Sequence, residues 1–264
     1  MTGPQLITSA ANPLLKDLRK LSQDSHGYRK LGRVWLEGDH LCSAALKRGV
    51  KPETAVFSQT LWDEQSFGLS GEADRDVIVP DEVFKSISSL ESPARMGFVI
   101  EAPQRPQIDT AAPSVVLDRL QDAGNVGSVL RSAGAFGFGQ IIAMKGTAAL
   151  WSPKVLRAGM GAHFGLALIE GAETHELDAL QMPLIATSSH KGDFIHEAKL
   201  PWPCAWLLGN EGQGLAESLA WRAKLSVRIA QPGGEESLNV AAAAAICLHA
   251  SAVYNRALPH TRTP

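Results

Sequence analysis

The chain has 264 residues, 45% of them hydrophobic and 20% charged, as in an ordinary globular protein with one large domain or two smaller ones. Its formal net charge of −2 gives no overall sign of a nucleic-acid-binding protein. No apolar run is long enough to span a bilayer, and residues 1–18 lack the basic segment and apolar core of a secretory signal, so we expect a cytoplasmic protein without a membrane segment.

The first 50 residues form the basic part of the chain. They hold eight Lys or Arg against four Asp or Glu, a net charge of +4 that leaves −6 for the remainder. A local basic patch can contact phosphates although the whole molecule is acidic. These side chains could equally cover solvated helix faces. Six of them are candidate phosphate contacts: Lys16, Arg19, Lys20, Arg29, Lys30 and Arg33.

Short apolar runs alternate with helical patterns up to residue 101. The spacing predicts a helix over residues 37–48, which Gly49 ends, and a helix over 82–90, which Asp81 caps. It predicts strands over residues 55–57, 77–79 and 96–101. Residues 104–113 are proline-rich with few apolar residues, which is typical of a linker. We therefore expect a small α/β domain over residues 1–103, a linker over 104–113 and a second domain over 114–264.

The alternation is clearer in the second domain. Strands are predicted over residues 115–117, 141–144, 166–169, 184–187, 205–208 and 226–230. Helices are predicted over residues 126–136, 153–162, 173–180, 214–222 and 237–257, with Pro153 in the first turn of its helix. Short buried strands that alternate with helices indicate an α/β fold with a mostly parallel sheet, covered by helices on both faces.

Three runs in this domain combine glycines with a few polar side chains. They are LDRLQDAGNVGSVLRSAGAFGFG over residues 117–139, LLGNEGQGL over 207–215 and VRIAQPGGEESLNV over 227–240. Glycine lets the backbone approach a ligand, and α/β folds place ligands where loops follow strands. The polar members of the runs are therefore candidate site residues: Asn125, Arg131, Asn210, Glu211, Ser237 and Asn239.

In this order and spacing, the three runs resemble the signature motifs of the SpoU family, also called the TrmH-type RNA ribose methyltransferases, of the SPOUT superfamily. The resemblance implies transfer of a methyl group from S-adenosylmethionine (AdoMet) to a ribose 2′-hydroxyl of RNA. It also implies a C-terminal trefoil knot and a homodimer formed through the C-terminal domain. Residues 7–21 and 34–46 resemble an L30e-like substrate-binding domain, which makes the six basic residues candidate RNA contacts.

Methyl transfer from a sulfonium is an in-line displacement, which needs aligned reactants and loss of the hydroxyl proton but no metal. The resemblance carries a catalytic set onto five residues of this chain: Asn125, Arg131, Glu211, Ser237 and Asn239. A guanidinium at position 131 can hold the phosphate beside the target ribose and stabilise the developing oxyanion. A role as general base, given to this arginine in the family, stays open although free arginine remains charged.

These residues also have structural interpretations. Asn125 and Ser237 could cap helices, and Glu211 could be an exposed loop residue or approach Arg131 or an asparagine. Arg119 lies outside the matched positions and is interpreted as a structural residue or a minor RNA contact.

The resemblance also implies an AdoMet pocket. Its candidate contacts in this chain are Thr187, Gly209, Ile229 and Leu238. The chain departs from the family pattern twice, with Asp122-Ala123-Gly124-Asn125 in place of Asp-Pro-Gly-Asn, and Ile229-Ala230-Gln231 in place of Ile-Pro-Met. The first departure relaxes a turn without removing a reacting group. The second alters the loop beneath the cofactor.

The RNA substrate is left open between ribosomal and transfer RNA, and the accessory domain favours ribosomal RNA. The alternative function is that of a non-catalytic RNA-binding or assembly protein that retains the SPOUT fold, and the intact polar set argues against it. A dinucleotide-binding turn at Gly124 and Gly127 is excluded, because Gly-x-x-Gly is not the fingerprint of that turn.

Overall fold

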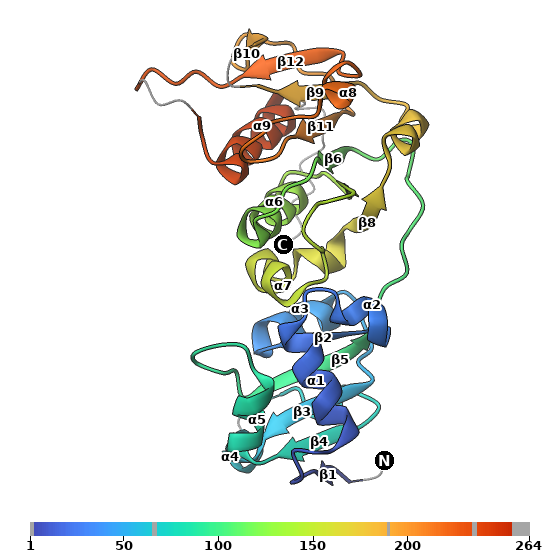
Figure 1. The fold of residues 1–264 in the computed structure, drawn as a ribbon, viewed down its shortest axis with the longest axis vertical. Coiled ribbons are helices and arrows are strands. Elements are labelled where there is room, and N and C mark those ends of the chain that lie inside the picture. The colour runs from blue at the N-terminus through green and yellow to red at the C-terminus, as the bar shows by residue number, and fades with distance from the viewer. Residues whose placement is uncertain (1–2, 65–67, 189–190, 234–236, 255–264) are drawn as a thin grey trace, which may run out of the picture. The chain divides into compact units, whose positions relative to one another are not determined.

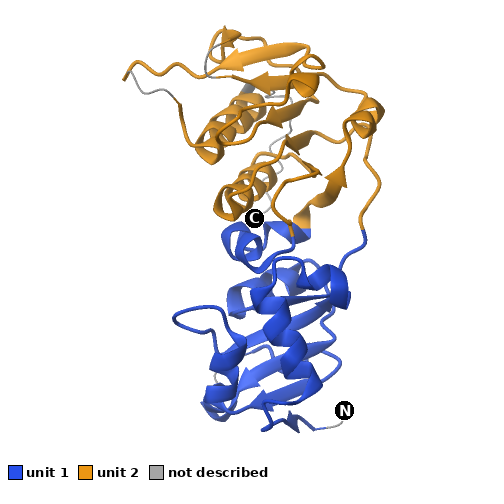
Figure 2. Ribbon diagram, viewed as in Figure 1, with its two compact units in different colours: residues 1–104, 151–164 blue, residues 105–150, 165–264 orange. Residues whose placement is uncertain are grey.

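The computed structural model describes residues 3–64, 68–188, 191–233 and 237–254. The chain forms two compact units, one of residues 1–104 and 151–164, the other of residues 105–150 and 165–264 (Figure 2). Residues 151–164 therefore group with the first unit, although they follow the expected linker. The domain boundaries expected from the sequence stay a prediction. In the described part of the chain, every helix is too short or too polar to cross a membrane.

The first unit contains a mixed five-stranded sheet in the order β1-β4-β3-β5-β2. Parallel pairs join β1, β4 and β3, and antiparallel pairs join β3, β5 and β2. The strands are β1 (Gln5–Leu6), β2 (Arg33–Glu37), β3 (Thr54–Ser58), β4 (Asp76–Val79) and β5 (Met96–Glu101). The helices are α1 (Pro13–Gln23), α2 (Gly27–Leu31), α3 (Asp39–Lys47), α4 (Gln59–Glu64), α5 (Asp81–Ile87) and α7 (Pro153–Gly159).

Local chemistry sets the ends of these helices. Asn12 caps α1, since its Oδ1 accepts the backbone N–H of Leu14 at 2.9 Å. The expected cap at Asp81 is wrong: Pro80 occupies the N-cap of α5, and the carboxylate of Asp81 accepts from the backbone N–H and the hydroxyl of Thr60. The predicted helix over residues 37–48 begins late, because Glu37 ends strand β2.

The second unit contains a seven-stranded sheet in the order β10-β12-β9-β11-β6-β7-β8, and all its strand pairs are parallel (Figure 1). The strands are β6 (Ser114–Leu117), β7 (Gln140–Met144), β8 (Ala167–Ala172), β9 (Leu184–Thr187), β10 (Asp193–Phe194), β11 (Ala205–Leu208) and β12 (Leu225–Arg228). The predicted α/β fold with a parallel sheet is confirmed. The trefoil knot implied by the resemblance stays a prediction.

Helices cover both faces of this sheet, because alternate side chains of each strand point to opposite faces. On one face, Trp206 of β11 donates from Nε1 to Ser251 Oγ at 3.0 Å in α9 (Val240–Tyr254), and α9 packs against α6 (Ala123–Ala135). On the other face, Ala205 and Leu207 belong to a core cluster with Leu177 and Leu219. Those two leucines come from the 3₁₀ helix η2 (Thr174–Ala179) and from α8 (Glu217–Ala220). A further 3₁₀ turn, η1, spans Ala162–Gly165.

The strand order predicts a ligand site beyond the carboxyl ends of the central strands of this sheet. Strand β6 lies between β7, which follows it in the chain, and β11, which comes much later. The connections from these neighbouring strands therefore diverge beyond their carboxyl ends, which is where open α/β sheets bind ligands. The loops after β6 and β11 contain the first two glycine-rich runs.

Candidate active site

The loop after β6 turns directly into α6. Asp122 is the N-cap of this helix, and its Oδ1 accepts the backbone N–H of Asn125 at 2.7 Å. The interpretation of Asn125 as the cap is therefore wrong. Asn125 lies in the first turn of α6, and its side chain is available for contacts with the other two runs.

A directional chain of hydrogen bonds joins the three glycine-rich runs. The Nδ2 of Asn125 donates to Glu211 Oε1 at 3.2 Å, and the Oδ1 of Asn125 accepts from Asn239 Nδ2 at 2.9 Å. A carboxylate only accepts hydrogen bonds, so Glu211 requires the amino group of Asn125 to face it. That orientation leaves Asn125 Oδ1 facing Asn239, which must present its own amino group. The charge of Glu211 thus sets the orientation of both amides.

Glu211 is held as an anion by several donors. Besides Asn125, the backbone N–H groups of Gln121 and Asp122 donate to its two oxygens at 3.3 Å each. Partial burial raises the pKa of Glu211, but the hydrogen bonds from backbone amides and from Asn125 outweigh it, so that the net pKa lies below the ordinary value. The carboxylate is therefore ionised at neutral pH and ties the loop after β11 to the start of α6.

Asn239 binds three partners at once. Its Oδ1 accepts the backbone N–H groups of Ala241 and Ala242 at 2.9 and 3.3 Å and so caps α9, while its Nδ2 reaches Asn125. The helix begins at Val240, three residues later than expected, and the interpretation of Ser237 as its cap is wrong. The cap of α9 is thereby part of the polar chain.

A cavity of about 950 Å³ opens beside this chain of hydrogen bonds. Its wall comes from the ends of β9, β11 and β12 and from the start of α9. All four residues expected to contact the cofactor line it, namely Thr187, Gly209, Ile229 and Leu238, together with Asn210, Glu211, Ser237 and Asn239. A concave site of this size with convergent polar groups is typical of a small-molecule pocket.

At Gly209 the backbone of the loop packs closely against a later part of the same loop. A Cβ atom added there would lie 2.2 Å from the backbone nitrogen of Leu215 and 2.4 Å from the carbonyl carbon of Gly214. Any larger residue must therefore displace the far side of the loop. The glycine thus allows the loop to fold back on itself at the wall of the cavity.

Gln231 brings a polar group to the same wall. Its Oε1 is buried and has no hydrogen-bond partner within the described residues, although the residue lines the cavity. A buried acceptor without a partner is costly, and a ligand that donates a hydrogen bond would remove that cost. The amino groups and ribose hydroxyls of AdoMet are donors of this kind, so the orphaned acceptor and the close-packed loop at Gly209 both fit this cofactor.

Arg131 lies apart from the cavity lining. It is an exposed residue of α6, and within the described part of the chain no hydrogen bond or ion pair engages its guanidinium. Six residues of α-helix separate it from Asn125, which corresponds to about 9 Å along the axis and about 120° around it. The structure thus brings together four of the five predicted catalytic residues and presents Arg131 to solvent.

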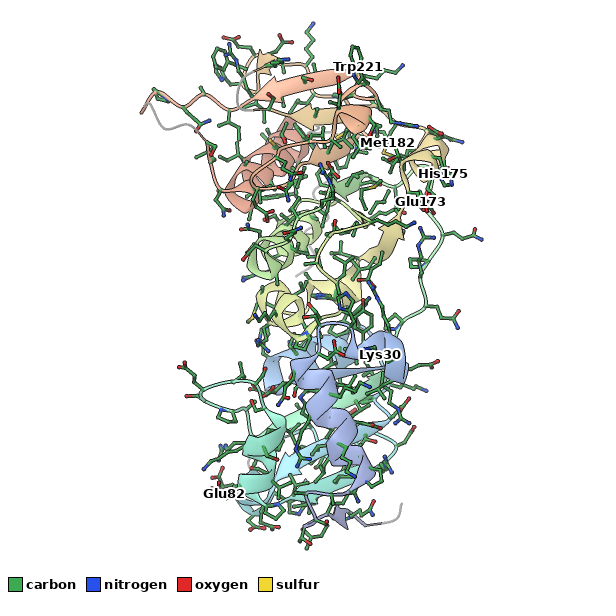
Figure 3. All side chains as sticks on the ribbon, viewed as in Figure 1. Lys30, Glu82, Glu173, His175, Met182 and Trp221 are labelled. Atoms are coloured by element: carbon green, nitrogen blue, oxygen red, sulfur yellow. The ribbon has the colours of Figure 1, made fainter. Side chains whose placement is uncertain are left out.

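The six basic residues of the first unit differ in their exposure and in their partners. Of the exposed ones, Lys30 forms an ion pair with Asp24 at 3.5 Å, and Arg29 donates from Nε to Tyr28 Oη at 2.9 Å. Lys16 and Lys20 are exposed one turn apart on α1, and Arg29 and Lys30 are exposed on α2, where Lys30 is marked in Figure 3. Arg19 instead donates to the backbone oxygen of Ala10 at 2.9 Å and to Ser86 Oγ. Arg33 is paired with Glu53 at 2.9 Å. The sequence pattern could not separate these two structural arginines from the others.

Three residues beside the site were missed or undervalued from the sequence. Asp118 is 2% exposed and accepts both Nε and Nη2 of Arg119, at 2.8 and 3.0 Å. Arg119 also donates from Nη1 to Gln213 Oε1 at 3.0 Å. An acidic residue directly after a buried strand was a signal for Asp118, whereas the contact to Gln213 spans 94 positions and had none.

The comparisons with known proteins agree with this geometry. A family model described as the SpoU rRNA methylase family matches residues 112–249, and one described as an MRM3-like substrate binding domain matches residues 12–96. The chain is 30% identical over 253 residues to the 23S rRNA (guanosine(2553)-2′-O)-methyltransferase RlmP of Bacillus subtilis, covering 92% of this chain and 97% of that protein. It is 34% identical over 152 residues to the human mitochondrial rRNA methyltransferase 3, covering 54% of this chain and 36% of that protein.

Solved structures extend the likeness to nearly the whole chain. An AdoMet-bound rRNA methyltransferase from Sinorhizobium meliloti matches with a TM-score of 0.82 at 27% identity, covering 95% of this chain and 98% of that one. The family, the reaction class and the cofactor expected from the sequence are confirmed. The chain therefore belongs to the SpoU rRNA methylase family, as an AdoMet-dependent RNA 2′-O-methyltransferase.

Proposed function

We propose that this protein methylates the ribose 2′-hydroxyl of one nucleotide in large-subunit ribosomal RNA, in the cytoplasm. The observation that carries the proposal is the chain of hydrogen bonds through Glu211, Asn125 and Asn239 at the edge of the 950 Å³ cavity. Ribosomal RNA is favoured over transfer RNA because relatives that match the chain are named as rRNA methyltransferases and because residues 12–96 match a substrate-binding domain.

In this proposal the cavity holds AdoMet, which supplies a methyl group on a sulfonium leaving group. The loop around Gly209 and the residues Thr187, Ile229 and Leu238 would form the walls around it, and Gln231 Oε1 would accept a hydrogen bond from one of its N–H or O–H groups. Backbone and apolar contacts of this kind fix the cofactor, so that the reacting groups need little reorganisation.

Glu211 acts as a brace. Three donors, Asn125 and two backbone amides, fill most of its acceptor positions, and its pKa is lowered, so it is a poor acceptor for the hydroxyl proton. The brace fixes Asn125 and, through it, Asn239. Ser237, which lines the cavity, and Asn239 are then placed to contact the RNA ribose or phosphate.

In this proposal the target ribose lies between the cavity and Arg131, which is outside the cavity lining and provides positive charge to the RNA. Its guanidinium is exposed on α6, where a phosphate of the substrate can reach it. It would hold that phosphate and stabilise the oxyanion that develops as the hydroxyl loses its proton. Water or a substrate group then takes the proton, which avoids the need for a neutral arginine.

The first unit selects the RNA. We assign the phosphate contacts chiefly to Lys16, Lys20, Arg29 and Lys30, because these four residues are exposed, whereas Arg19 and Arg33 are half-buried. Counterion release from these contacts makes RNA binding weaker as salt rises.

The protein works as a homodimer through α9. Ala242, Ile246, His249 and Val253 follow one another at spacings of four, three and four residues and are all exposed, with Ile246 and Val253 at 41% and 44%. Such spacing places them on one stripe of the helix, which suits packing against a second helix. Light scattering of the full chain at micromolar concentration should give twice the monomer mass of 28.2 kDa.

The substrate is tested by mapping 2′-O-methyl groups in total RNA from a strain that lacks the gene and from its parent. We expect one 2′-O-methyl of large-subunit ribosomal RNA to disappear, and to return with the wild-type gene but not with an Arg131→Ala gene. Loss of a transfer RNA methyl group instead, or of none, would contradict the proposal.

A further inference from the structure

Arg119 has an unusual backbone. Its φ is +57°, in the left-handed region that non-glycine residues seldom adopt. Within the described residues, Met160 in the other unit is the second non-glycine residue with a positive φ. A conformation of this kind persists where surrounding contacts hold it, and it points to a role for the side chain.

The side chain of Arg119 joins two elements with one planar group. Two of its nitrogens bind the two oxygens of the buried Asp118, and the third donates to Gln213 in the loop after β11. Hydrogen bonds and charge from Asp118 raise the pKa of Arg119, so the guanidinium is permanently cationic. A fork that binds a carboxylate with two N–H groups fixes its own orientation.

The same two residues hold the loop at two further points. The backbone oxygen of Arg119 accepts Nδ2 of Asn210 at 2.8 Å, and Asp118 Oδ2 accepts the backbone N–H of Ala216 at 2.7 Å. The loop over residues 209–216 is thus held near its start, in its middle and at its end. Asn210 and Gln213 line the cavity, while Arg119 does not.

We propose that Asp118 and Arg119 form a clamp that shapes the loop over residues 209–216 before the cofactor binds, with Arg119 as a positioning residue. This inference rests on the proposed role of the cavity as the AdoMet pocket. Three glycines, at positions 209, 212 and 214, give the free loop many conformations. Ordering it in advance removes an entropic cost that binding would otherwise bear.

The first test replaces Arg119 by lysine. Arg119→Lys keeps a positive charge for Asp118 but cannot reach Gln213 at the same time. We expect the Kd for AdoMet, measured by calorimetry, to rise about tenfold, which corresponds to about 1.4 kcal/mol. Amide hydrogen exchange over residues 210–216 of the free protein should become faster.

The matched control is Arg222→Lys. Arg222 is 33% exposed, against 34% for Arg119, and it pairs with Asp178 in the same unit without lining the cavity. This control should leave both the Kd and the exchange of the loop unchanged. An unchanged Kd and unchanged loop exchange in Arg119→Lys would overturn the clamp.

A double-mutant cycle separates the clamp from a direct cofactor contact by Gln213. If Arg119 acts through Gln213, the variant with Arg119→Lys and Gln213→Ala should bind AdoMet no more weakly than the worse single variant. Additive effects would overturn the proposal.

Loop exchange is measured without cofactor, so a wild-type protein that binds no AdoMet would contradict the function while leaving the clamp testable. If Arg119→Lys does not fold, faster exchange of the loop in Gln213→Ala supports the clamp and unchanged exchange rejects it.

Discussion

Asn239→Asp separates the two tasks of Asn239. An aspartate keeps an oxygen for the backbone N–H groups of Ala241 and Ala242, and its charge suits the N-terminus of α9. The second oxygen, however, would face Asn125 Oδ1 at 2.9 Å with no hydrogen between them. Asn125 cannot turn its amide to help, because its amino group is held by Glu211. The substitution therefore preserves the helix cap and breaks the polar chain.

The size of the effect follows from these contacts. Loss of one hydrogen bond that leaves an acceptor unsatisfied costs about 1–3 kcal/mol. If the chain of hydrogen bonds is needed in the transition state, the single-turnover rate of methyl transfer should fall by about 5- to 150-fold. The melting temperature should fall less than that of Asn239→Ala, because the cap remains and the added charge, worth about 0.3–1 kcal/mol, offsets part of the lost hydrogen bond.

The assay is transfer of labelled methyl groups to RNA at saturating AdoMet, with thermal unfolding measured in parallel. Asn239→Ala is the matched control, since it breaks both contacts: its rate should fall similarly, and its melting temperature should lie about 3 °C below that of Asn239→Asp, for a lost cap of about 1 kcal/mol. A wild-type rate in Asn239→Asp would refute the reasoning. So would a melting temperature as low as that of Asn239→Ala.

Four further outcomes are expected. Arg131→Ala should lower methyl transfer by about 10²–10³-fold with unchanged AdoMet affinity by calorimetry. Gly209→Ala should weaken AdoMet binding because its Cβ would clash with the backbone of Leu215. Gly212→Ala should bind normally, because among the described residues its Cβ would meet Asn210 Oδ1 alone, at 3.8 Å. Replacing Lys16 and Lys20 together by alanine should flatten the salt dependence of RNA binding by about 0.7–0.9 per lost phosphate contact, and an unchanged slope would exclude them. The stability gained from Glu211 should be complete above its ordinary pKa of 4.5 and disappear as pH falls through the lowered folded-state pKa; Glu211→Gln should remove this acid transition in thermal unfolding.

The sheet of the second unit could be predicted because its strands are short, apolar and buried. Residues 115–117, 141–144, 184–187 and 205–208 all lie inside observed strands. Such runs are typical of parallel strands covered on both faces, and the loops that follow them must meet at one edge. This is why residues of the second and third glycine-rich runs line one cavity, while Asn125 of the first run is hydrogen-bonded to Glu211 and Asn239 beside it.

Other features of the site and the fold could not be predicted, because no pattern in the neighbouring sequence indicates them or because the pattern was not used. The bond between Asn125 and Glu211 spans 86 positions, and that between Asn125 and Asn239 spans 114, so no sequence pattern could assign their orientation. The predicted helix over residues 214–222 is shorter, because Gly214 adopts a φ of +68° and pairs with Asn210 instead. The range of helix α1 was not predicted, although a capping asparagine, a proline in the first turn and leucines at helical spacing indicate it.

The contact between Trp206 and Ser251 sets the rotational phase of α9. The helix α9, with the sequence VAAAAAICLHASAVY, is apolar around its whole circumference. Hydrophobic packing alone would therefore allow the helix to rotate about its axis or to shift along it. A slip of one residue turns every side chain by about 100°. The buried indole N–H permits one phase, because Ser251 Oγ must face it. Asn239 lies twelve residues earlier, about 18 Å along the axis, so the rotation of the helix that Ser251 fixes also fixes the direction of the Asn239 side chain. The serine at the far end thus keeps the asparagine aimed at Asn125.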